Sequence, residues 1–388
     1  MKLMIPGPID IFEETLEALG RPVRAHYSES FLELYRDTVD MAQQIFQTKN
    51  DIIIMTAPGS GALDSGVSSL FSPGEKVAIA NNGFFAIRMI NAMKAFGLDV
   101  LTVDDDWGQA SDVNKMRQAI DDNPSVAGIV VIANDTGTGV VNPVEEYAQL
   151  AREKDLPIFV DAVSAMGGYD LPVDKWELDV VCTSSNKALE TAPGLGIISV
   201  SERAWDIIGK KSEGATHRGW YYDLSRWKAA IDGSPEHPYP TTQASNMIVS
   251  LHASLDRIVN VETVTGHWAR YAWARDVFRA GIRNLGFDPI ASDDIASPTV
   301  TTFRFRDDMA DNLELRDYLL KQHDILVAVG MGSYGKTVLR AGHMGKAGTR
   351  EYLVPALLGI EDFVRDVKGQ NIPQGAGLVG FSGKSNWR

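Results

Sequence analysis

The chain has 388 residues, 44% of them hydrophobic and 23% charged, which is the composition of a folded globular protein and argues against disorder. Single hydrophobic cores stop growing at roughly 250–300 residues, so the length favours two domains. The 37 Lys and Arg against 51 Asp and Glu give a formal net charge of −14. Because an acidic chain repels a phosphate backbone, no nucleic-acid partner is expected.

Cysteine usage and hydropathy predict where the protein works. The single cysteine, Cys182, cannot form an intramolecular disulfide, which fits a reducing compartment. The first ten residues lack an apolar stretch of signal-peptide length, since Pro6 and Pro8 interrupt them. Apolar runs such as Ala127–Ala133 fall well short of the ~18 residues that a membrane helix needs. We therefore expect a cytoplasmic enzyme without a membrane partner.

The first two hundred residues contain seven short apolar runs. Val and Ile follow one another in most of them without alternating with polar residues, which is the pattern of strands buried on both faces of a parallel sheet. The predicted strands are Asp51–Thr56, Lys76–Ala80, Asp99–Val103, Gly128–Ala133, Pro157–Asp161, Leu178–Thr183 and Leu195–Val200.

Helical patterns lie between these strands. Asn142 and Pro143 predict one helix start, with Asn as the N-cap, Pro at the first helical position and two glutamates in the first turn. That helix is expected to run to about Lys154, and others fit Ala62–Leu70, Phe84–Phe96 and Asp112–Asp121. Strands and helices that alternate over about 150 residues predict a doubly wound α/β domain.

The pattern changes after Ser201. Residues 211–243 show little periodicity and predict a long ordered excursion, and Gln243–Leu285 predicts two helices that cross between domains. A smaller α+β domain follows, and the tail from Gly369 is expected to be a surface segment. The elements predicted for the smaller domain are Pro298–Phe305, Leu313–His323, Ile325–Val329, Thr337–Ala341 and Thr349–Val367.

Three features stand out at the carboxyl ends of the predicted strands, where open α/β sheets bind ligands. Gly59 and Ser60 lie in a small-residue turn before a helix, where free N–H groups would cradle a phosphate. A plain tight turn explains them equally well, and Asp64 occupies the third glycine position of a dinucleotide fingerprint. Asp161 ends the fifth strand, with a helix cap as its alternative role. Lys187 follows the sixth strand, where an ordinary lysine is solvated.

A phosphate cradle, an aspartate and a lysine at one sheet edge match the needs of pyridoxal phosphate. The lysine amine forms a Schiff base with the aldehyde, the carboxylate pairs with the protonated pyridine nitrogen, and the cradle holds the phosphate. The ring nitrogen has to stay protonated so that the ring accepts carbanion electrons. This requirement explains a carboxylate rather than an amide.

The chain resembles the class V aminotransferases of fold type I, in the alanine–glyoxylate and serine–pyruvate group, over nearly its whole length. The motifs that carry the resemblance are modest singly and specific in this order. They are Pro6-Gly7-Pro8, Gly59-Ser60-Gly61, Ser72-Pro73-Gly74-Glu75-Lys76-Val77, Thr138-Gly139-Val140, Asp161-Ala162-Val163-Ser164-Ala165-Met166-Gly167-Gly168, Ser185-Asn186-Lys187-Ala188-Leu189 with Pro193-Gly194, and Leu339-Arg340-Ala341-Gly342-His343-Met344-Gly345.

The resemblance implies a fold type I transferase with a mostly parallel seven-stranded sheet flanked by helices, and a smaller C-terminal α+β domain. Residues 13–258 are expected to form the large domain that binds the cofactor. Residues 1–12 and 259–388 are expected to form the small domain, with the N-terminal segment at the active-site cleft. A homodimer is implied too, because in this family a neighbouring subunit completes the phosphate site.

The resemblance also implies roles for single residues. Lys187 is expected to be the Schiff-base lysine and the acid–base catalyst, and Asp161 the partner of the pyridine nitrogen. The other expected cofactor contacts are Val163 and Phe85 on the two ring faces, Thr136 on the phenolic oxygen, and Gly59, Ser60, Gly61 and Asn186 on the phosphate, joined by Thr242 from the neighbouring subunit. Whether Tyr239 or Thr241 contributes there is open.

The substrate side of the site follows from the same resemblance. Arg340 matches the arginine that clamps the substrate carboxylate, a role that suits the planar fork of a guanidinium, and Gly7 and Pro8 are expected beside the substrate. The implied activity is ping-pong transamination (EC 2.6.1.-) from a small amino donor to pyruvate or glyoxylate through the Lys187 Schiff base. A lyase or decarboxylase that uses pyridoxal phosphate on the same scaffold is the alternative.

Two branches of the family show local similarity, which leaves the substrate open. Ser292–Pro298 and the Arg340 segment resemble the pyridoxamine–pyruvate branch. However, Pro58–Ser60 keeps the ordinary phosphate-binding pattern, and Met331 stands where that branch carries a second arginine. Residues 46–50 instead resemble the ureidoglycine–glyoxylate branch.

Other classes of protein find less support. The seven histidines are dispersed without metal-ligand spacing, so no metal site is expected, and His343 is expected to be structural. No Gly-x-Ser-x-Gly elbow indicates a hydrolase. A cysteine desulfurase needs a cysteine on a mobile loop, whereas Cys182 falls in a predicted buried strand. A protein that only binds the cofactor would not need Lys187, Asp161 and Arg340 together.

Overall fold

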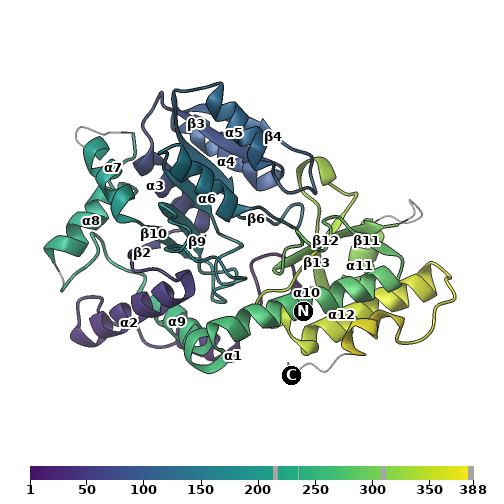
Figure 1. The fold of residues 1–388 in the computed structure, drawn as a ribbon. Helices are drawn as coiled ribbons and strands as arrows, with labels where there is room; N and C mark the ends of the chain where they lie inside the picture. Colours follow the sequence, from purple (N-terminus) through teal and green to yellow (C-terminus); the bar gives the residue numbers. More distant parts are fainter. Residues whose placement is uncertain (213–216, 235, 307–311, 383–388) are drawn as a thin grey trace.

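Two main β-sheets organise the fold (Figure 1). The computed structural model describes residues 1–212, 217–234, 236–306 and 312–382. Within these ranges, the larger sheet has seven strands in the order β2-β10-β9-β8-β5-β3-β4. Their bounds are β2 Asp51–Thr56, β3 Lys76–Asn81, β4 Asp99–Asp104, β5 Val126–Ile132, β8 Ile158–Asp161, β9 Val180–Ser184 and β10 Leu195–Val200.

The prediction of a mostly parallel seven-stranded sheet is confirmed, and each strand overlaps a predicted run. β10 differs in direction, since it pairs antiparallel with both β2 and β9, whereas the other neighbours in the sheet are parallel. All residues of β8, β9 and β10 are buried. Burial of both faces explains why apolar residues are adjacent in these strands instead of alternating.

Helices flank the large sheet (Figure 1). α3 (Gly59–Leu70) packs on β9 and β10, α4 (Phe84–Ala95) on β3 and β4, and α6 (Val144–Glu153) on β5 and β8. Gly66 lets α3 approach the sheet, because a Cβ there would lie 2.7 Å from the Phe159 ring. Around these run α1 (Glu13–Leu19), α2 (Glu29–Phe46), α5 (Val113–Asp121) and α7 (Glu202–Ser212).

The predicted N-cap of α6 is wrong. The helix begins at Val144, with Pro143 at the N-cap position and no side-chain cap. The buried Asn142 amide instead accepts from the Ser111 N–H at 3.0 Å and donates to the Ile132 carbonyl at 2.7 Å. Asn142 therefore joins neighbouring segments of the chain, because these buried backbone groups need a partner more than the exposed first turn of the helix does.

The smaller sheet has the order β1-β13-β14-β12-β11 within the described residues and is the predicted α+β layer. The N-terminal strand β1, which the sequence pattern did not predict, pairs in parallel with β13. The bounds are β1 Lys2–Met4, β11 Phe287–Pro289, β12 Val300–Phe305, β13 Ile325–Val329 and β14 Leu339–Gly342. α11 (Asn312–His323) packs on β13, and α12 (Arg350–Asp362) packs on α11 and β1.

A long helical segment joins the two sheets, as the prediction of two crossing helices requires (Figure 1). α9 (Ser245–Asp256) continues through a π-helical stretch, η1 (Arg257–Glu262), into α10 (Val264–Asn284). One hydrophobic cluster lies on the large sheet and a second on the small sheet. These clusters support a division into residues 13–258 and residues 1–12 with 259–388, which stays a prediction.

Two further segments differ from expectation. Residues 211–243 contain a helix, α8 (Leu224–Gly233), that their weak periodicity did not predict; residues 213–216 and 235 of this segment lie outside the described ranges. The tail from Gly369 is more than a surface segment, because Ala376–Ser382 forms a 3-10 helix, η5, packed on α10 and α12. Its glycines concealed this, since they pack through their backbone: a Cβ on Gly281 of α10 would collide with the Gly377 carbonyl.

None of the helices in the described ranges is long and apolar enough to cross a bilayer.

Candidate active site

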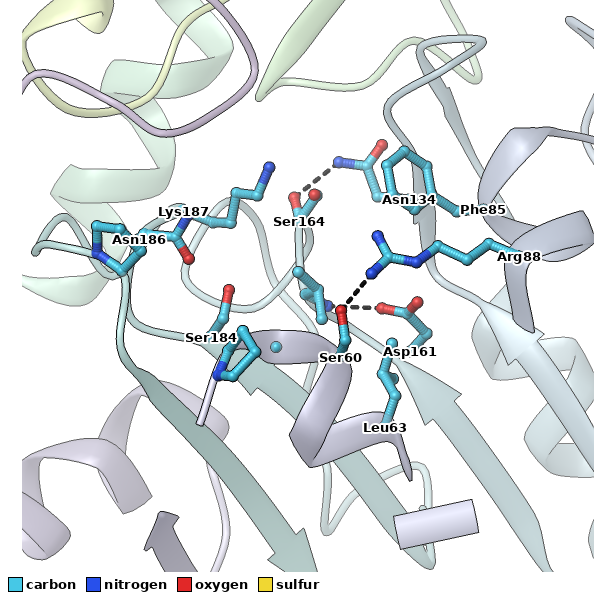
Figure 2. A pocket seen from close by; sticks show the side chains of 14 residues that line it. Ser60, Leu63, Phe85, Arg88, Asn134, Asp161, Ser164, Ser184, Asn186 and Lys187 are labelled. Atoms are coloured by element: carbon cyan, nitrogen blue, oxygen red, sulfur yellow. Dashed lines mark hydrogen bonds between the residues drawn. The ribbon is translucent and has the colours of Figure 1, made fainter. Parts of the chain in front are cut away.

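A pocket of about 760 Å³, counted with its open mouth, lies at the carboxyl ends of strands of the large sheet (Figure 2). Its walls come from α3, α4 and the loops after β5, β8 and β9, which is where ligands bind in sheets of this kind. The predicted site residues that line it are Gly59, Ser60, Phe85, Asp161, Val163, Asn186 and Lys187.

Lys187 lies in the loop after β9, and its amine is held by the N-terminal segment. Nζ donates to the Pro6 carbonyl at 2.5 Å. A Cβ on Gly7 would lie only 2.5 Å from Nζ, so the lysine occupies space that a larger residue would need. The pairing of β1 with β13 holds this segment on the small sheet. The lysine therefore stands where the two sheets meet.

The charge of Lys187 is disfavoured in its surroundings. Burial lowers the pKa of the Lys187 amine to about 8, and the positive charges of Arg340 and Arg88 act in the same direction, while Asp161 opposes them. An amine with this pKa is partly neutral near pH 7, and only the neutral amine is a nucleophile or a base.

Asp161 is the last residue of β8 and lies at the floor of the pocket (Figure 2). Its Oδ1 accepts from the Val163 N–H at 2.9 Å. Burial raises the pKa of the Asp161 carboxyl to about 6. A buried carboxylate that is ionised at physiological pH needs a cation, so this position suits a positively charged ligand atom.

The phosphate cradle predicted at Gly59 and Ser60 forms the first turn of α3. A Cβ on Gly59 would lie 3.0 Å from the Ser184 Cβ and 3.2 Å from Val163, so the close approach requires glycine. The Ser60 hydroxyl accepts from the Arg88 guanidinium. A helix N-terminus beside a guanidinium favours an anion. Gly61 is not part of the pocket lining.

Asp135 ties two predicted cofactor residues to each other. Its carboxylate accepts from the Phe85 N–H at 2.8 Å, the Gly137 N–H at 2.8 Å and the Thr138 N–H at 3.0 Å. Phe85 is the second residue of α4, and Thr136 lies in the turn of the hairpin β6 (Asn134–Asp135) and β7 (Val140–Val141). Asp135 therefore holds the backbone at Phe85 beside the turn that contains Thr136.

Arg340 on β14 reaches across from the small sheet. Its Nε donates to the Val329 carbonyl at 2.8 Å and its Nη1 to the Thr136 carbonyl at 3.2 Å. These bonds hold the guanidinium beside the Thr136 turn and orient its plane. Burial lowers the pKa of Arg340. A desolvated guanidinium of fixed orientation is suited to a carboxylate.

Three polar atoms around the site have no hydrogen-bond partner in the described part of the chain. They are the Thr136 hydroxyl, the Ser184 hydroxyl and the Asn134 Oδ1, and all three are buried. Buried polar groups are ordinarily paired, so each calls for a bound group or water. The Asn134 amide nitrogen is already used, since it donates to the Ser164 carbonyl and to the Thr299 hydroxyl, each at 2.7 Å.

Some predicted site residues do not line the pocket of their own chain, namely Gly7, Pro8, Gly61, Thr136, Thr242 and Arg340. Pro8 is exposed, and the contact with Lys187 is made by Pro6 instead. Thr242 is exposed and does not line the pocket. Tyr239 is fully buried and donates its hydroxyl to the His26 carbonyl, which leaves it engaged within its own chain.

Sequence reasoning missed several residues that line the pocket. Arg88 is the most important, since it places a second cation over Ser60 and near Asp161 (Figure 2). The sequence contains an indication of this position, because Arg88 lies three residues after Phe85 and residues at that spacing share a helix face. The other missed lining residues are Pro58, Leu63, Asn134, Ser164, Ser184 and Pro193.

Among the residues described, no group of three or more His, Cys, Asp or Glu side chains could hold a metal ion. His343 is fully buried, lies 2.8 Å from the Thr301 hydroxyl through Nε2, and has its pKa lowered to about 3 by burial. Cys182 is buried in β9, as predicted.

Comparison with known proteins identifies the class of protein to which this fold and this pocket belong. The model of the family described as aminotransferase class-V matches residues 12–339. The chain belongs to the class V aminotransferase family and has the fold type I architecture of these enzymes. Members of this family are in general dependent on pyridoxal phosphate.

Individual relatives agree with this assignment. An uncharacterized aminotransferase of Methanocaldococcus jannaschii is 31% identical over 90% of this chain and 89% of that protein. The structure of a pyridoxamine–pyruvate aminotransferase from Mesorhizobium loti has a TM-score of 0.89 at 27% identity, covering 97% of this chain and 95% of that one. An alanine–glyoxylate aminotransferase from Nostoc has a TM-score of 0.86 at 26% identity, covering 92% and 94%. The predicted family is confirmed.

Proposed function

We propose that this class V aminotransferase uses pyridoxal phosphate to move an amino group from a small amino donor to pyruvate or glyoxylate in a ping-pong cycle. The observation that carries the proposal is the Lys187 amine. It is buried, has a pKa of about 8, and interacts electrostatically with Asp161 at the pocket floor and with Arg340 from the small sheet. A nucleophilic amine, a carboxylate in need of a cation and a carboxylate clamp are the groups that transamination requires.

The pocket fits pyridoxal phosphate group by group. The N-terminus of α3 at Gly59 and Ser60 would take the phosphate, Asp161 the protonated ring nitrogen, and the unpaired Thr136 hydroxyl the phenolic oxygen. Phe85 and Val163 would contact the two ring faces, and Asn186 would add a phosphate contact. When bound, the cofactor supplies an aldehyde that condenses with amines and a cationic ring that draws electrons from carbon.

Lys187 is proposed to carry out the proton transfers. In its neutral form the amine would hold the aldehyde of the cofactor, and it would carry a proton to and from the substrate's α-carbon. A base with a pKa near 8 transfers protons in both directions near neutral pH. The Pro6 carbonyl accepts from the same amine and so keeps it at the mouth of the site.

Arg340 is proposed to orient the donor. Its guanidinium would hold the α-carboxylate in a bidentate fork, which decides which bond of the α-carbon faces the ring and which faces Lys187. Gly7 leaves the room that the amine and a small side chain need. A small donor and a small oxo acid are therefore the proposed substrates.

The pH dependence of Lys187 gives a first prediction. In the cofactor-free protein, acylation of Lys187 by an amine-selective reagent should rise about tenfold per pH unit and level off above pH 8, because only the neutral amine reacts. Surface lysines such as Lys115 should show no such levelling below pH 9. Mass spectrometry of peptides labelled between pH 6 and 9.5 measures both. A Lys187 profile parallel to that of Lys115 would contradict the lowered pKa.

Asp161 gives a second prediction, on stability. Because its folded-state pKa is about 6 and the ordinary value is 3.8, the cofactor-free protein loses stability as the pH rises through this window. Each pH unit is worth about 1.4 kcal/mol, so Asp161→Asn should stabilise the cofactor-free protein by roughly 2–3 kcal/mol at pH 8 and little at pH 4. Thermal unfolding of both proteins at the two pH values measures this.

A contrasting variant makes that measurement specific. Asp179 is buried as well, but it pairs with Arg152 at 2.8 Å and Arg203 at 3.2 Å. Asp179→Asn should therefore destabilise the protein at pH 8, because it leaves Arg152 without its carboxylate and removes one of the two carboxylate partners of Arg203, the other being Asp155. Equal effects of the two substitutions would show that Asp161 has no unmet need for a cation.

We also propose that two copies of the chain share each site. Thr242 is exposed outside the pocket of its own chain, so it is available to the phosphate site of a second copy. Tyr239 is not available, because it is buried and bonded to His26, and Thr241 is the remaining candidate beside Thr242. The cytoplasmic location expected from the composition stays a prediction.

A pyridoxamine–pyruvate aminotransferase is the second candidate, favoured by the likeness to the enzyme of that name. Pro58–Ser60 and Met331 argue against it, since they keep the ordinary phosphate-binding turn and lack the second arginine. The two candidates separate when pyridoxamine with pyruvate is compared with alanine, serine or glycine as donor to the loaded enzyme. Turnover of free pyridoxamine alone would favour the second candidate. Release of carbon dioxide or ammonia would indicate the decarboxylase or lyase alternative.

A further inference from the structure

A buried cluster of charges lies beside the lysine loop and outside the pocket. Glu190, three residues after Lys187, is fully buried, and its carboxylate pairs with the guanidinium groups of Arg257 and Arg270. The Arg270 contact measures 2.8 Å, and the Tyr271 hydroxyl donates to the same carboxylate oxygen. Buried charges are costly unless they are fully paired, so the cluster depends on each member.

A second carboxylate completes the pairing. Glu262 accepts from Arg270 Nε at 2.6 Å and from Arg257 Nη1 at 3.1 Å. His267 lies 3.0 Å from Arg270 and, through Nε2, 3.0 Å from the Ala188 carbonyl. Burial lowers the pKa of His267 to about 4, so it is neutral here. Two buried carboxylates thus face two guanidinium groups, and a third, more exposed carboxylate, Glu14, lies 3.3 Å from Arg257 Nε.

The cluster connects two segments that are distant in the sequence. Glu190 accepts from the Gly345 N–H at 3.0 Å, and Arg270 donates to the Gly345 carbonyl at 3.2 Å. Gly345 begins η3 (Gly345–Gly348), five residues after Arg340. In the other direction, the Glu190 N–H donates to the Lys187 carbonyl at 3.0 Å. One side chain therefore links the loop of the catalytic amine to the segment of the guanidinium clamp.

The backbone conformation at Glu190 indicates that many contacts hold this residue in place. Its φ is +56°, in the left-handed region that residues other than glycine rarely adopt. Such a conformation persists where the surrounding contacts over-determine it. The preceding carbonyls are fixed as well, Ala188 by His267 and Leu189 by the Ser254 hydroxyl at 2.7 Å. The lysine loop therefore cannot shift unless Glu190 moves with it.

We propose that Glu190 is a positioning residue, which sets the Lys187 amine in register with the Arg340 guanidinium by clamping both segments to α10. This inference rests on the proposed function, in which Lys187 moves a proton at the carbon whose carboxylate Arg340 holds. Displacement by about 1 Å of such paired groups costs on the order of 10²-fold in rate. Loss of the clamp should therefore lower kcat while cofactor binding survives.

The test compares Glu190→Gln with a matched control. Glu361 is another buried glutamate, 1% exposed, which accepts from the Gly375 and Gly377 N–H groups and pairs with Arg365, away from both sites. Both variants lose a buried negative charge that is paired with arginine, with two guanidinium groups at Glu190 and one at Glu361. With cofactor bound, Glu190→Gln should keep the visible absorption band and lose roughly 10- to 100-fold in kcat, whereas Glu361→Gln should keep kcat within twofold.

A second readout does not depend on activity. In the cofactor-free protein, the pH midpoint of Lys187 acylation should rise by roughly 0.5–1 unit in Glu190→Gln, because a loosened loop exposes the amine to water and moves it from Arg340. The midpoint should not change in Glu361→Gln. If the wild-type protein fails to transaminate any donor, the proposed function fails, and this comparison still decides whether Glu190 positions Lys187.

The proposal is overturned if Glu190→Gln melts at a lower temperature, as Glu361→Gln does, but keeps kcat and the Lys187 midpoint. If Glu190→Gln does not fold, Tyr271→Phe replaces it, because it removes a single hydroxyl bonded to Glu190 and close to Gly345 at 3.3 Å. That variant should lower kcat about threefold and raise the Lys187 midpoint. Unchanged values in Tyr271→Phe would overturn the proposal equally.

Discussion

Lys187→Ala should abolish transamination, with a fall in kcat/KM of at least about 10⁴-fold. General acid–base catalysis alone contributes about 10²–10⁴-fold, and the variant also loses the amine that attaches the cofactor. The structure explains why no neighbour substitutes: among the described residues lining the pocket, Lys187 carries the single amine. Rates with an amino donor and an oxo acid measure the loss.

Spectra and a control variant separate this loss from misfolding. Lys187→Ala should retain the wild-type unfolding temperature to within a few degrees, and its cofactor should be removed by dialysis because no covalent link forms. Lys115 is an exposed lysine paired with Asp105 on the surface, and Lys115→Ala should keep both the activity and the link. A Lys187→Ala protein that still turned over would show that another group carries the chemistry.

Arg340→Ala should raise the KM for the amino donor about 100-fold and leave the bound cofactor's absorption band in place. Two charge-assisted hydrogen bonds to the substrate carboxylate are lost, and about 2.7 kcal/mol corresponds to 100-fold. The position also contacts the Thr136 and Val329 carbonyls, so a small fall in kcat is expected from the disturbed turn. Steady-state kinetics with varied donor concentration measure both values.

A pair of donors isolates the clamp. Alanine carries the carboxylate that Arg340 is proposed to hold, whereas ethylamine has the same carbon chain without it. Arg340→Ala should weaken the reaction of alanine with the cofactor-loaded protein and leave that of ethylamine unchanged. Arg340→Lys should recover little, because an ammonium lacks the bidentate fork. Equal losses with both donors, or loss of the cofactor band, would mean that Arg340 acts on the fold or on the cofactor.

The large sheet could be predicted because each of its strands is recognised from residues that are adjacent in the sequence. Strands buried on both faces need consecutive apolar residues, and the seven predicted runs, most of which have that pattern, all formed strands of one sheet. Polar residues directly after such runs then mark the carboxyl edge, which is how Asp161 and Lys187 were found. The roles of these residues came from family resemblance, whereas the shared pocket is a finding of the structure.

Other features depend on partners that are distant in the chain. Glu190 is one turn residue among many until α10 brings Arg257 and Arg270 to it. The contact of Pro6 with Lys187 requires β1 to pair with β13, and three residues are too short a strand for a pattern to reveal. Asn142 has the composition of an N-cap and a different use, because Ser111 and Ile132 are buried beside it.

The central claim is tested most directly by the two half-reactions, watched separately in one cuvette. The protein loaded with pyridoxal phosphate should lose its visible band when a small amino acid is added without acceptor, releasing one oxo acid per site. Pyruvate or glyoxylate should then restore the band and yield one amino acid per site. A band that no donor changes, or a change accompanied by carbon dioxide or ammonia, would contradict ping-pong transamination at Lys187.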